Sequence, residues 1–429
     1  MKKAPFHQRT LSNGLRVIVI PMNATAAVTL SVFIGTGSKY ETKDINGVSH
    51  FLEHLFFKGS AKRPNPGDVS RALDQMGAQH NAFTSKEITG YWVKTAVKHF
   101  DTALDVIADI LLNPLFKSEE IDKERGVIAQ EISMFEDMPM RKIGDIWEEL
   151  IYGRQPAGWS ITGTHENIKN ITRNAIIKYR DSQYVASNTI AVVAGNIGIE
   201  DAFKKVKDAL SGFKPGRAKG KIAVFEKQSR PQVRAVSKKT DQTHFILGFR
   251  NGYDMYSEKR HASDLLGVIL GGNSSSRFFH EIREKRGLAY YVRAESEHYT
   301  DSGYLAGSAG VNNGALEEAV GIMLREFRDI AKNGPTEDEI KFAKDNLRGS
   351  LAISFESSDE LAGYYGEREL FHKKLVTPEE MFKHIENVSR DDIVKIASDM
   401  IRPRNLNLAV IGERPNTSSL QKILAGALK

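Results

Sequence analysis

Residues 47–58, GVSHFLEHLFFK, contain two histidines and a glutamate in the pattern H-x-x-E-H, namely His50, Glu53 and His54. A helix turns by about 100° per residue, so the three side chains share one face and the histidines lie one turn apart. That spacing allows two imidazoles to bind one metal ion. Glu53 lies beside them, where it could accept a proton from water at the metal. The segment therefore predicts a metal site with a general base.

The rest of this segment is apolar, which predicts a buried helix. The apolar residues are Phe51, Leu52, Leu55, Phe56 and Phe57. Buried polar side chains need partners, and a metal ion would provide one for the whole cluster. The alternative is a half-buried helix whose histidines make ordinary hydrogen bonds. That alternative suits a lone histidine better than three polar residues at this spacing.

A catalytic metal site needs a third protein ligand and an open position. The chain has no cysteine, so a carboxylate is the expected third ligand. A helix expected to start at Ser118, as its N-cap, carries Glu124 and Glu131 seven residues apart on one face. An acid on the inner side of such a helix is costly unless it is used. Both glutamates are therefore candidates.

The composition is that of an ordinary globular chain. Of 429 residues, 41% are hydrophobic and 27% charged, which argues against extensive disorder, and the length predicts two to four domains. The net charge of +6 is spread along the chain without the basic stripe expected for nucleic-acid binding. The lack of cysteine excludes disulfides, cysteine nucleophiles and thiolate-bound metals. No G-x-S-x-G motif suggests a serine nucleophile.

The beginning of the chain, MKKAPFHQRT, resembles neither a signal peptide nor a transit peptide. The apolar stretch at 15–35 is too interrupted to span a bilayer, and it predicts two strands, at 15–20 and 27–34. The interrupting residues are Arg16, Pro21 and Asn23. We therefore expect a cytoplasmic protein without a membrane partner.

The sequence contains an internal repeat. The matching pairs are IKNITR (168–173) with IENVSR (385–390), AVVAG (191–195) with LAVIG (408–412), and SEEIDKERGVIAQEI (118–132) with EDEIKFAKDNLRGSL (337–351). The offset is 217 residues for the first two pairs and near 219 for the third. Ordered matches at a nearly constant offset indicate a duplication.

The duplication predicts three regions: a metal-binding half at 1–212, a linker at 213–232 and a homologous half without a metal site at 233–429. The linker is rich in Gly, Pro, Lys and Arg, as exposed connectors are. Each half begins with strands and continues with helices and more strands. We expect an α+β fold of two homologous α/β-sandwich halves, each a mostly antiparallel sheet covered by helices.

The second half indicates which polar residues the shared fold does not require. Aligned through Gly59 and Gly271, it places Ala262, Leu265 and Leu266 opposite His50, Glu53 and His54, and Ala343 and Ser350 opposite Glu124 and Glu131. The polar cluster is missing from the copy, so the fold alone does not explain it.

Together these features resemble the pitrilysin (inverzincin) family of zinc peptidases, and within it the bacterial relatives of mitochondrial processing peptidase. The resemblance extends along the chain through SNGLRVIV (12–19), NAFTSKEITGYW (81–92), ERGVIAQEISMFED (124–137) and SSRFFHEIREKRGLAYYV (275–292). It implies one zinc ion per chain on His50, His54 and Glu131, with Glu53 as general base. Glu124 would be a second acid supporting the site.

The resemblance also implies that NAFTS is an edge strand that pairs with an extended substrate, with Asn81, Ala82 and Phe83 as substrate-binding residues. The alternative is an ordinary edge strand. LGGNSSSR (270–277) matches a loop implicated in substrate binding, through Gly271 and Gly272. Because it lacks G-K-[ST], it is not a nucleotide site.

In the second half, Arg283 and Tyr290 match a pair that contacts substrate and helps to stabilise an oxyanion. Without the resemblance, they could be a solvated helix end followed by a strand. A chain with both this pair and the zinc residues needs no different partner, which favours a homodimer.

The implied function is a zinc-dependent metalloendopeptidase that cuts unfolded peptides or presequence-like segments inside a closed chamber. The main alternative is a non-catalytic assembly or binding subunit of the same family. Such members have lost residues of the H-x-x-E-H set, whereas this chain retains all of them. General peptide degradation and dedicated processing of one protein remain open.

Overall fold

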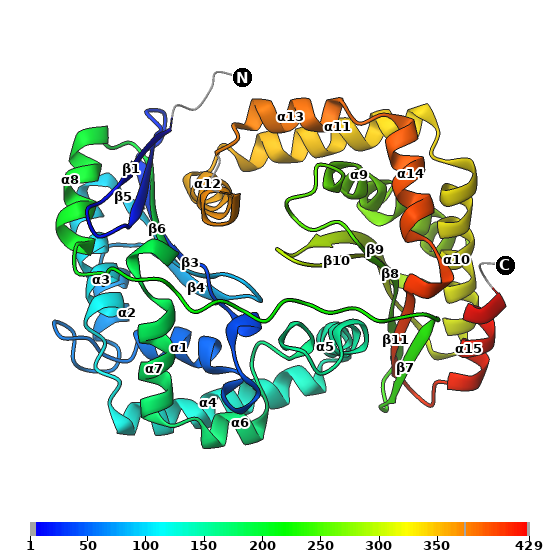
Figure 1. Cartoon of the computed structure of the whole chain (residues 1–429), viewed down its shortest axis with the longest axis horizontal. Coiled ribbons are helices and arrows are strands. Elements are labelled where there is room, and N and C mark those ends of the chain that lie inside the picture. Colours follow the sequence, from blue (N-terminus) through cyan, green and yellow to red (C-terminus); the bar gives the residue numbers. More distant parts are fainter. Residues whose placement is uncertain (1–5, 373–374, 427–429) are drawn as a thin grey trace. The chain divides into compact units, whose positions relative to one another are not determined.

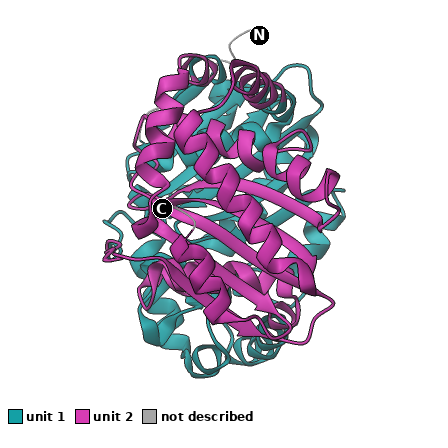
Figure 2. Cartoon of the chain, turned by 90° about the vertical axis from the view of Figure 1, so that its right-hand side faces the viewer, with its two compact units in different colours: residues 1–132, 160–222, 350–380 teal, residues 133–159, 223–349, 381–429 magenta. Residues whose placement is uncertain are grey.

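The computed structural model describes residues 6–372 and 375–426. The first five residues, on which the expectation of no leader partly rests, lie outside the described residues. The chain forms two compact units (Figure 2). Unit 1 contains the described residues of 1–132, 160–222 and 350–380, and unit 2 those of 133–159, 223–349 and 381–429.

Unit 1 has a six-stranded sheet in the order β1-β2-β6-β3-β5-β4 (Figure 1). The strands are β1 (His7–Thr10), β2 (Arg16–Pro21), β3 (Ala27–Ile34), β4 (Gln79–Thr84), β5 (Thr89–Ala96) and β6 (Thr189–Gly195). Among them β2 and β6 are parallel, and the other neighbours are antiparallel. The predicted strands at 15–20 and 27–34 correspond to β2 and β3, with β6 between them.

The helices of unit 1 cover this sheet and carry the candidate metal ligands. They are α1 (Val48–Phe56), α2 (Asp68–Asp74), α3 (Phe100–Leu112), α4 (Ser118–Asp137), α6 (His165–Asn170), α7 (Arg173–Gln183), α8 (Ile199–Leu210) and α12 (Ser358–His372). Helix α4 continues past residue 132 into unit 2.

Unit 2 has a five-stranded sheet in the order β7-β11-β8-β10-β9. Its strands are β7 (Gln232–Ser237), β8 (Gln242–Asn251), β9 (Ala289–His298), β10 (Gly303–Asn312) and β11 (Leu406–Gly412). Here β7 and β11 are parallel, and the other neighbours are antiparallel. Two mostly antiparallel sheets with helices confirm the predicted α+β fold class.

The helices of unit 2 are α5 (Pro139–Tyr152), α9 (Arg260–Gly271), α10 (Leu316–Asn333), most of α11 (Glu337–Ser354) and of α13 (Pro378–Glu386), α14 (Arg390–Met400) and α15 (Thr417–Gly426). Helix α11 ends and helix α13 begins in unit 1. A π-helical turn, η6, covers Phe279–Glu284. The 3-10 turns are η1 (Ser38–Tyr40), η2 (Lys43–Ile45), η3 (Val97–His99), η4 (Pro156–Gly158), η5 (Ala186–Asn188), η7 (Asn313–Ala315) and η8 (Pro403–Asn405).

The repeat in the sequence is also a repeat in topology. The order β2-β6-β3-β5-β4 in unit 1 has the same connectivity and strand directions as β7-β11-β8-β10-β9 in unit 2. Strands β6 and β11, which contain AVVAG and LAVIG, begin 217 residues apart and occupy the same place in their sheets. Strand β1 has no counterpart among the described strands of unit 2.

Two corresponding helices are exchanged between the halves of the sequence. Helix α5, from the first half, packs against β11 and β8, while α12, from the second half, packs against β3 and β6. The side chains Ile146, Trp147 and Ile151 of α5 belong to a core cluster with Ile246 and Ile411 of unit 2. The compact units therefore interleave along the chain and differ from contiguous halves at 1–212 and 233–429.

Among the described residues, no helix is both long and apolar enough to cross a membrane.

Candidate metal centre

Helix α1 positions the H-x-x-E-H residues, and its start is fixed by a buried carboxylate. Gly47 precedes the helix with a φ of 97°, a conformation that glycine adopts readily. Glu41 accepts hydrogen bonds from the backbone N–H groups of Gly47 at 2.7 Å and Ser49 at 2.8 Å. The carboxylate thus satisfies N–H groups that have no partner within the helix. The buried residues Phe51, Leu52, Leu55 and Phe56 anchor α1 in the core of unit 1.

Helix α4 presents the two candidate acids. It begins at Ser118, and Ile121 N–H bonds to Lys117 O, so Ser118 is the first helical residue and not the predicted N-cap. Ile121, Ile128 and Ile132 pack in the core. Glu124 and Glu131 lie on the side of α4 that meets the histidines of α1.

Three ligand atoms form a nearly equilateral triangle. Nε2 of His50 lies 3.3 Å from Nε2 of His54, and each nitrogen is 3.5 Å from Oε2 of Glu131. Two ligand atoms about 2.0–2.1 Å from a tetrahedral zinc ion are separated by roughly 3.3–3.4 Å. The triangle therefore has the dimensions of one face of a zinc tetrahedron. Within the described residues, this is the cluster of three His, Asp or Glu side chains that could hold a metal.

Glu124 stands behind the triangle. Its Oε2 lies 3.1 Å from Nδ1 of His54, and its Oε1 is 2.7 Å from Nζ of Lys58. Glu124 is 3% exposed, so the acid itself is buried. Although burial opposes it, the hydrogen bonds from His54 and Lys58 lower the pKa of Glu124. An ionised carboxylate at Nδ1 leaves Nε2 of His54 available as a ligand, the usual role of a carboxylate behind a metal-binding histidine.

The two histidines have opposite pKa shifts. Burial lowers the pKa of His50 to about 4, and the nearby His54 adds to that effect while Glu131 opposes it. Burial also acts to lower the pKa of His54, but hydrogen bonds with Glu124 and Glu131 outweigh it and raise that pKa to about 9. Hydrogen bonds with the acids of α4 thus determine the pKa of His54, whereas burial determines the pKa of His50.

Glu53 is held by a strand residue. Thr84, at the end of β4, donates from Oγ1 to Oε2 of Glu53 at 2.6 Å. Burial raises the pKa of Glu53, and the hydrogen bond from Thr84 partly opposes that shift. A carboxylate whose pKa is raised toward the working pH is a better proton acceptor.

The segment NAFTS lies mostly in β4, the edge strand of the sheet in unit 1. Asn81 and Ala82 are paired with Trp92 and Tyr91 of β5, and Asn81 Oδ1 accepts from the N–H of Ala82 at 2.9 Å. Phe83 packs near Phe33 with ring centroids 6.4 Å apart. The expected edge strand is therefore present, in the same unit as the histidines and Glu131.

Arg283 and Tyr290 are brought together in unit 2. Arg283, in η6, donates from Nη1 to the carbonyl oxygen of Tyr290 in β9. Its guanidinium also lies over the rings of Phe279 and Tyr290, 4.9 and 5.4 Å from their centroids. The Tyr290 side chain is 74% exposed, so the pair presents a phenol and a cation at the surface of the unit.

Gly271 and Gly272 have packing reasons to be glycine. Gly271 ends α9, and a β-carbon there would lie 2.2 Å from the backbone nitrogen of Ala294 in β9. A β-carbon on Gly272 would lie 2.7 Å from Cα of Val268. Close contact with β9 thus accounts for Gly271, and close contact with the last turn of α9 accounts for Gly272.

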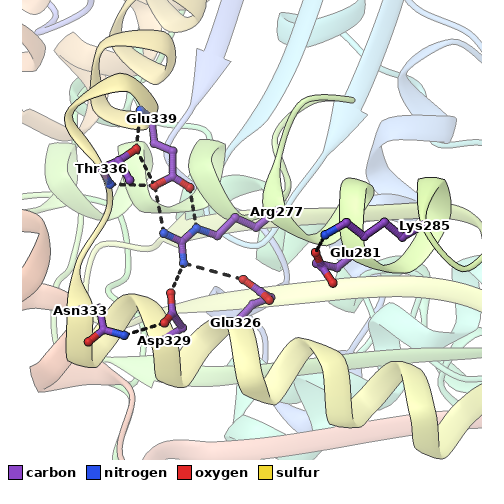
Figure 3. A network of polar contacts seen from close by, with 8 residues as sticks. All are labelled: Arg277, Glu281, Lys285, Glu326, Asp329, Asn333, Thr336 and Glu339. Atoms are coloured by element: carbon purple, nitrogen blue, oxygen red, sulfur yellow. Dashed lines mark hydrogen bonds and ion pairs between the residues drawn. The ribbon is translucent and has the colours of Figure 1, made fainter.

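Arg277 fixes the end of the loop at 270–277, which begins near Gly271 and Gly272 (Figure 3). Its guanidinium makes a bidentate pair with Glu339 of α11, at 2.6 and 2.9 Å, and reaches Asp329 of α10 at 2.7 Å. Glu326 lies 3.7 Å away. Two-point pairing with a carboxylate restrains the guanidinium in both position and orientation.

Glu41, Lys58 and Thr84 contribute to the site but were not identified from the sequence. Thr84 lies within the NAFTS block and, two residues from Ala82, on the same face of the strand. That alternation was the available signal for it. Glu41 and Lys58 act through contacts that no local spacing indicates.

The sequence matches known families over most of its length. Residues 16–165 match the family described as Insulinase (Peptidase family M16), and residues 170–347 match the one described as Peptidase M16 inactive domain. The chain belongs to the M16, or pitrilysin, family of zinc proteases, which confirms the resemblance.

Several bacterial proteins are similar to this chain. One, named Uncharacterized zinc protease YmxG, from Bacillus subtilis (strain 168), is 34% identical over 96% of this chain and 99% of its own. Another, Uncharacterized zinc protease SCO5738 from Streptomyces coelicolor, is 33% identical over 94% of this chain and 88% of its own. The crystal structure of a protease from Helicobacter pylori shares the fold, with a TM-score of 0.88, 24% identity and coverage of 96% of this chain and 100% of that one.

Proposed function

We propose that this chain is a zinc-dependent metalloendopeptidase that hydrolyses peptide bonds in unfolded peptides or presequence-like segments. The observation that carries the proposal is the triangle of His50 Nε2, His54 Nε2 and Glu131 Oε2, with edges of 3.3 to 3.5 Å. The names of the bacterial relatives, which call them zinc proteases, support the choice of metal.

The three side chains suit one zinc ion per chain, because three protein ligands leave a fourth position open. When bound, zinc supplies Lewis acidity toward water and toward the scissile carbonyl. Glu124 keeps Nδ1 of His54 occupied and so directs Nε2 into the site.

Glu53 is the proton acceptor in this proposal. Its Oε2 is held by Thr84, which restrains the carboxylate and leaves Oε1 to accept the proton of the attacking water. The same carboxyl group can then donate that proton to the leaving amine. General base and acid catalysis of this kind typically contributes 10²–10⁴-fold.

Substrate would bind by pairing with the edge strand β4, where Asn81, Ala82 and Phe83 lie. Arg283 and Tyr290 would donate hydrogen bonds toward the developing oxyanion. We place the reaction in a closed chamber formed by a homodimer, because one chain carries both residue sets and needs no different partner.

Metal content and peptide cleavage test the proposal together. The purified chain should contain about one zinc per chain and cut a proteome-derived peptide library, as read by mass spectrometry. The His50→Ala/His54→Ala variant should lose both the zinc and the cleavage. Stoichiometric zinc in that variant, or a zinc-loaded wild type that cuts no peptide in the library, would reject the proposal.

A further inference from the structure

A polar cavity of about 300 Å³ lies within unit 2, where the end of β8 meets the end of α14 and the turn η8. Three arginines line it: Arg250 at the end of β8, and Arg402 and Arg404 around the turn. Two acids, Glu226 and Asp399, line it as well. With both acids ionised, three cations against two anions leave one positive charge in the cavity.

The acids hold two of the arginines in place. Arg250 donates from Nε to the side-chain oxygen of Gln228 at 2.9 Å, and its Nη1 lies 3.4 Å from Glu226. Arg402 donates from Nη2 to Asp399 at 2.7 Å. Neither contact engages all the N–H groups of its guanidinium, which has five. Arg404 is exposed and makes no ion pair with any other described residue.

Asn251 adds a buried donor without a partner. Asn251 is one of the residues that line the cavity, and it is 2% exposed. Its Oδ1 accepts from the N–H of Tyr253 at 3.1 Å, which identifies Nδ2 as the free end. Nδ2 has no hydrogen-bond partner among the described residues. An unsatisfied buried donor is costly, so an acceptor supplied by a ligand would remove a real penalty.

The last carbonyls of a helix carry partial negative charge, so unpaired carbonyls at the end of helix α14 would repel an anion. Here those carbonyls already accept hydrogen bonds. Met400 O accepts from Arg402 N at 2.8 Å and from Asn405 Nδ2 at 3.0 Å, and Ser398 O accepts from Arg402 Nε at 3.0 Å. These hydrogen bonds reduce the negative potential that the end of α14 presents to an anion.

We propose that this cavity binds a small oxyanion, a carboxylate or a phosphate, between the guanidinium of Arg404 and the side-chain amide of Asn251, with Arg250 and Arg402 completing the positive wall. Arginine suits this ligand because its planar fork matches two oxygens of a carboxylate or phosphate. Burial raises the pKa of Glu226, although Arg250 opposes that shift. The raised pKa reduces the negative charge of Glu226 that would oppose an anion. The site uses no residue of the candidate metal centre.

Calorimetric titration of the full chain with inorganic phosphate tests the proposal, at constant ionic strength with chloride as the balancing anion. We expect saturable binding that Arg404→Ala weakens roughly tenfold or more, because a hydrogen bond to a charged group is lost. Asn251→Asp keeps the Oδ1 acceptor but replaces the donor with a negative charge, so it should abolish binding. Circular dichroism would show that both variants are folded.

Two controls separate this cavity from other anion sites. Arg217→Ala removes an exposed arginine of unit 1 that has no described partner, and should leave phosphate binding unchanged. The His50→Ala/His54→Ala variant should also bind phosphate as wild type does, since the candidate metal centre is not involved.

Titrations with acetate, and with N-acetylglycine against its amide, distinguish the two sources of oxyanion. Binding of phosphate alone would define a phosphoryl site. Saturable binding of acetate and N-acetylglycine but not of the amide would define a carboxylate site. Heats that do not saturate for any of these anions would overturn the proposal, as would binding that is unchanged in folded Arg404→Ala.

Discussion

Thr84 donates a 2.6 Å hydrogen bond to Glu53, from a strand to the helix that carries the candidate general base. The contact fixes one oxygen of a largely buried carboxylate. It also connects the base to β4, the strand on which we propose that substrate pairs. A shift of β4 would therefore alter the position of the Glu53 carboxylate through the side chain of Thr84.

Replacing Thr84 with valine should lower kcat roughly tenfold, since about one hydrogen bond that orients the base is lost. The KM for a model peptide should change less, and the zinc content should stay at wild-type level. Thr84→Ser keeps the hydroxyl and should recover most of the activity. Wild-type kcat in Thr84→Val, which keeps the methyl group and lacks the hydroxyl, would show that the hydrogen bond does not matter.

Glu53→Gln should retain zinc and the fold but lose about 10²–10⁴-fold in peptide hydrolysis, because the change removes the base and no ligand. Steady-state cleavage of a fluorogenic peptide and metal analysis of the same sample measure both quantities. Activity within a few-fold of wild type would show that Glu53 is not the base.

Glu124→Gln should weaken zinc binding by roughly 10–100-fold, the usual effect of losing the carboxylate behind a metal-binding histidine. The amide has nearly the same shape as the carboxylate, so the free energy of unfolding should be little changed. Competition with a chromogenic chelator gives the affinity. Unchanged affinity would mean that Glu124 serves packing, through Lys58, and not the metal.

The parts of the site that lie close in sequence could be predicted, and the parts that depend on distant contacts could not. His50 and His54 share a face of one helix, and Glu124 and Glu131 share a face of another, so helical spacing identified all four as candidates. The choice of Glu131 as the third ligand came from the family resemblance. Thr84 reaches Glu53 across 31 residues, through the packing of α1 against β4, which no spacing along the chain encodes.

The exchanged helices illustrate the same limit for the fold. The apolar side of α5, with Ile146, Trp147 and Ile151, predicts that the helix is buried. That pattern does not say which sheet covers it, and either sheet offers an apolar face. The duplication and the strand-rich start of each half were visible in the sequence, whereas the assignment of α5 and α12 to units required the packing itself.

Helix α12 should be sensitive to volume at one position. A β-carbon on Gly366 would lie 2.3 Å from Cε2 of the buried Phe33 in β3. Gly366→Ala should therefore destabilise the chain by about 1–2 kcal/mol, despite the better helix propensity of alanine. Gly363 lies in the same helix with nothing near its β-carbon position, so Gly363→Ala should be neutral or slightly stabilising. Urea denaturation midpoints compare the two, and equal effects would contradict the predicted clash.

Stability should depend on pH through His298 in unit 2. Burial acts to lower the pKa of His298, but the hydrogen bond with Asp264, at 3.1 Å, outweighs it and raises that pKa above the ordinary value of 6.5. A raised histidine pKa stabilises the fold fully below the unfolded pKa, and the benefit is lost as pH rises through the folded pKa. Asp264→Asn should thus destabilise by about 1 kcal/mol or less near pH 6, because Asp264 is partly exposed.

At pH 9 the difference between Asp264→Asn and wild type should be smaller than at pH 6. Thermal unfolding of both proteins across this range measures it. A difference that stays constant or grows toward pH 9 would have the wrong sign for this ion pair.

A mixing experiment tests whether the residues on one chain act with those of a second copy. Glu53→Gln chains lack the base, and Arg283→Ala/Tyr290→Ala chains lack the proposed oxyanion donors, so each preparation should be inactive alone. In a homodimer with sites shared between subunits, a mixed dimer would pair one intact zinc half with one intact Arg283–Tyr290 half. Statistical mixing makes half of the dimers mixed, each with one restored site, so about a quarter of wild-type activity should return. Confirmed subunit exchange without recovery would mean that each chain completes its own site, or that Arg283 and Tyr290 are not required.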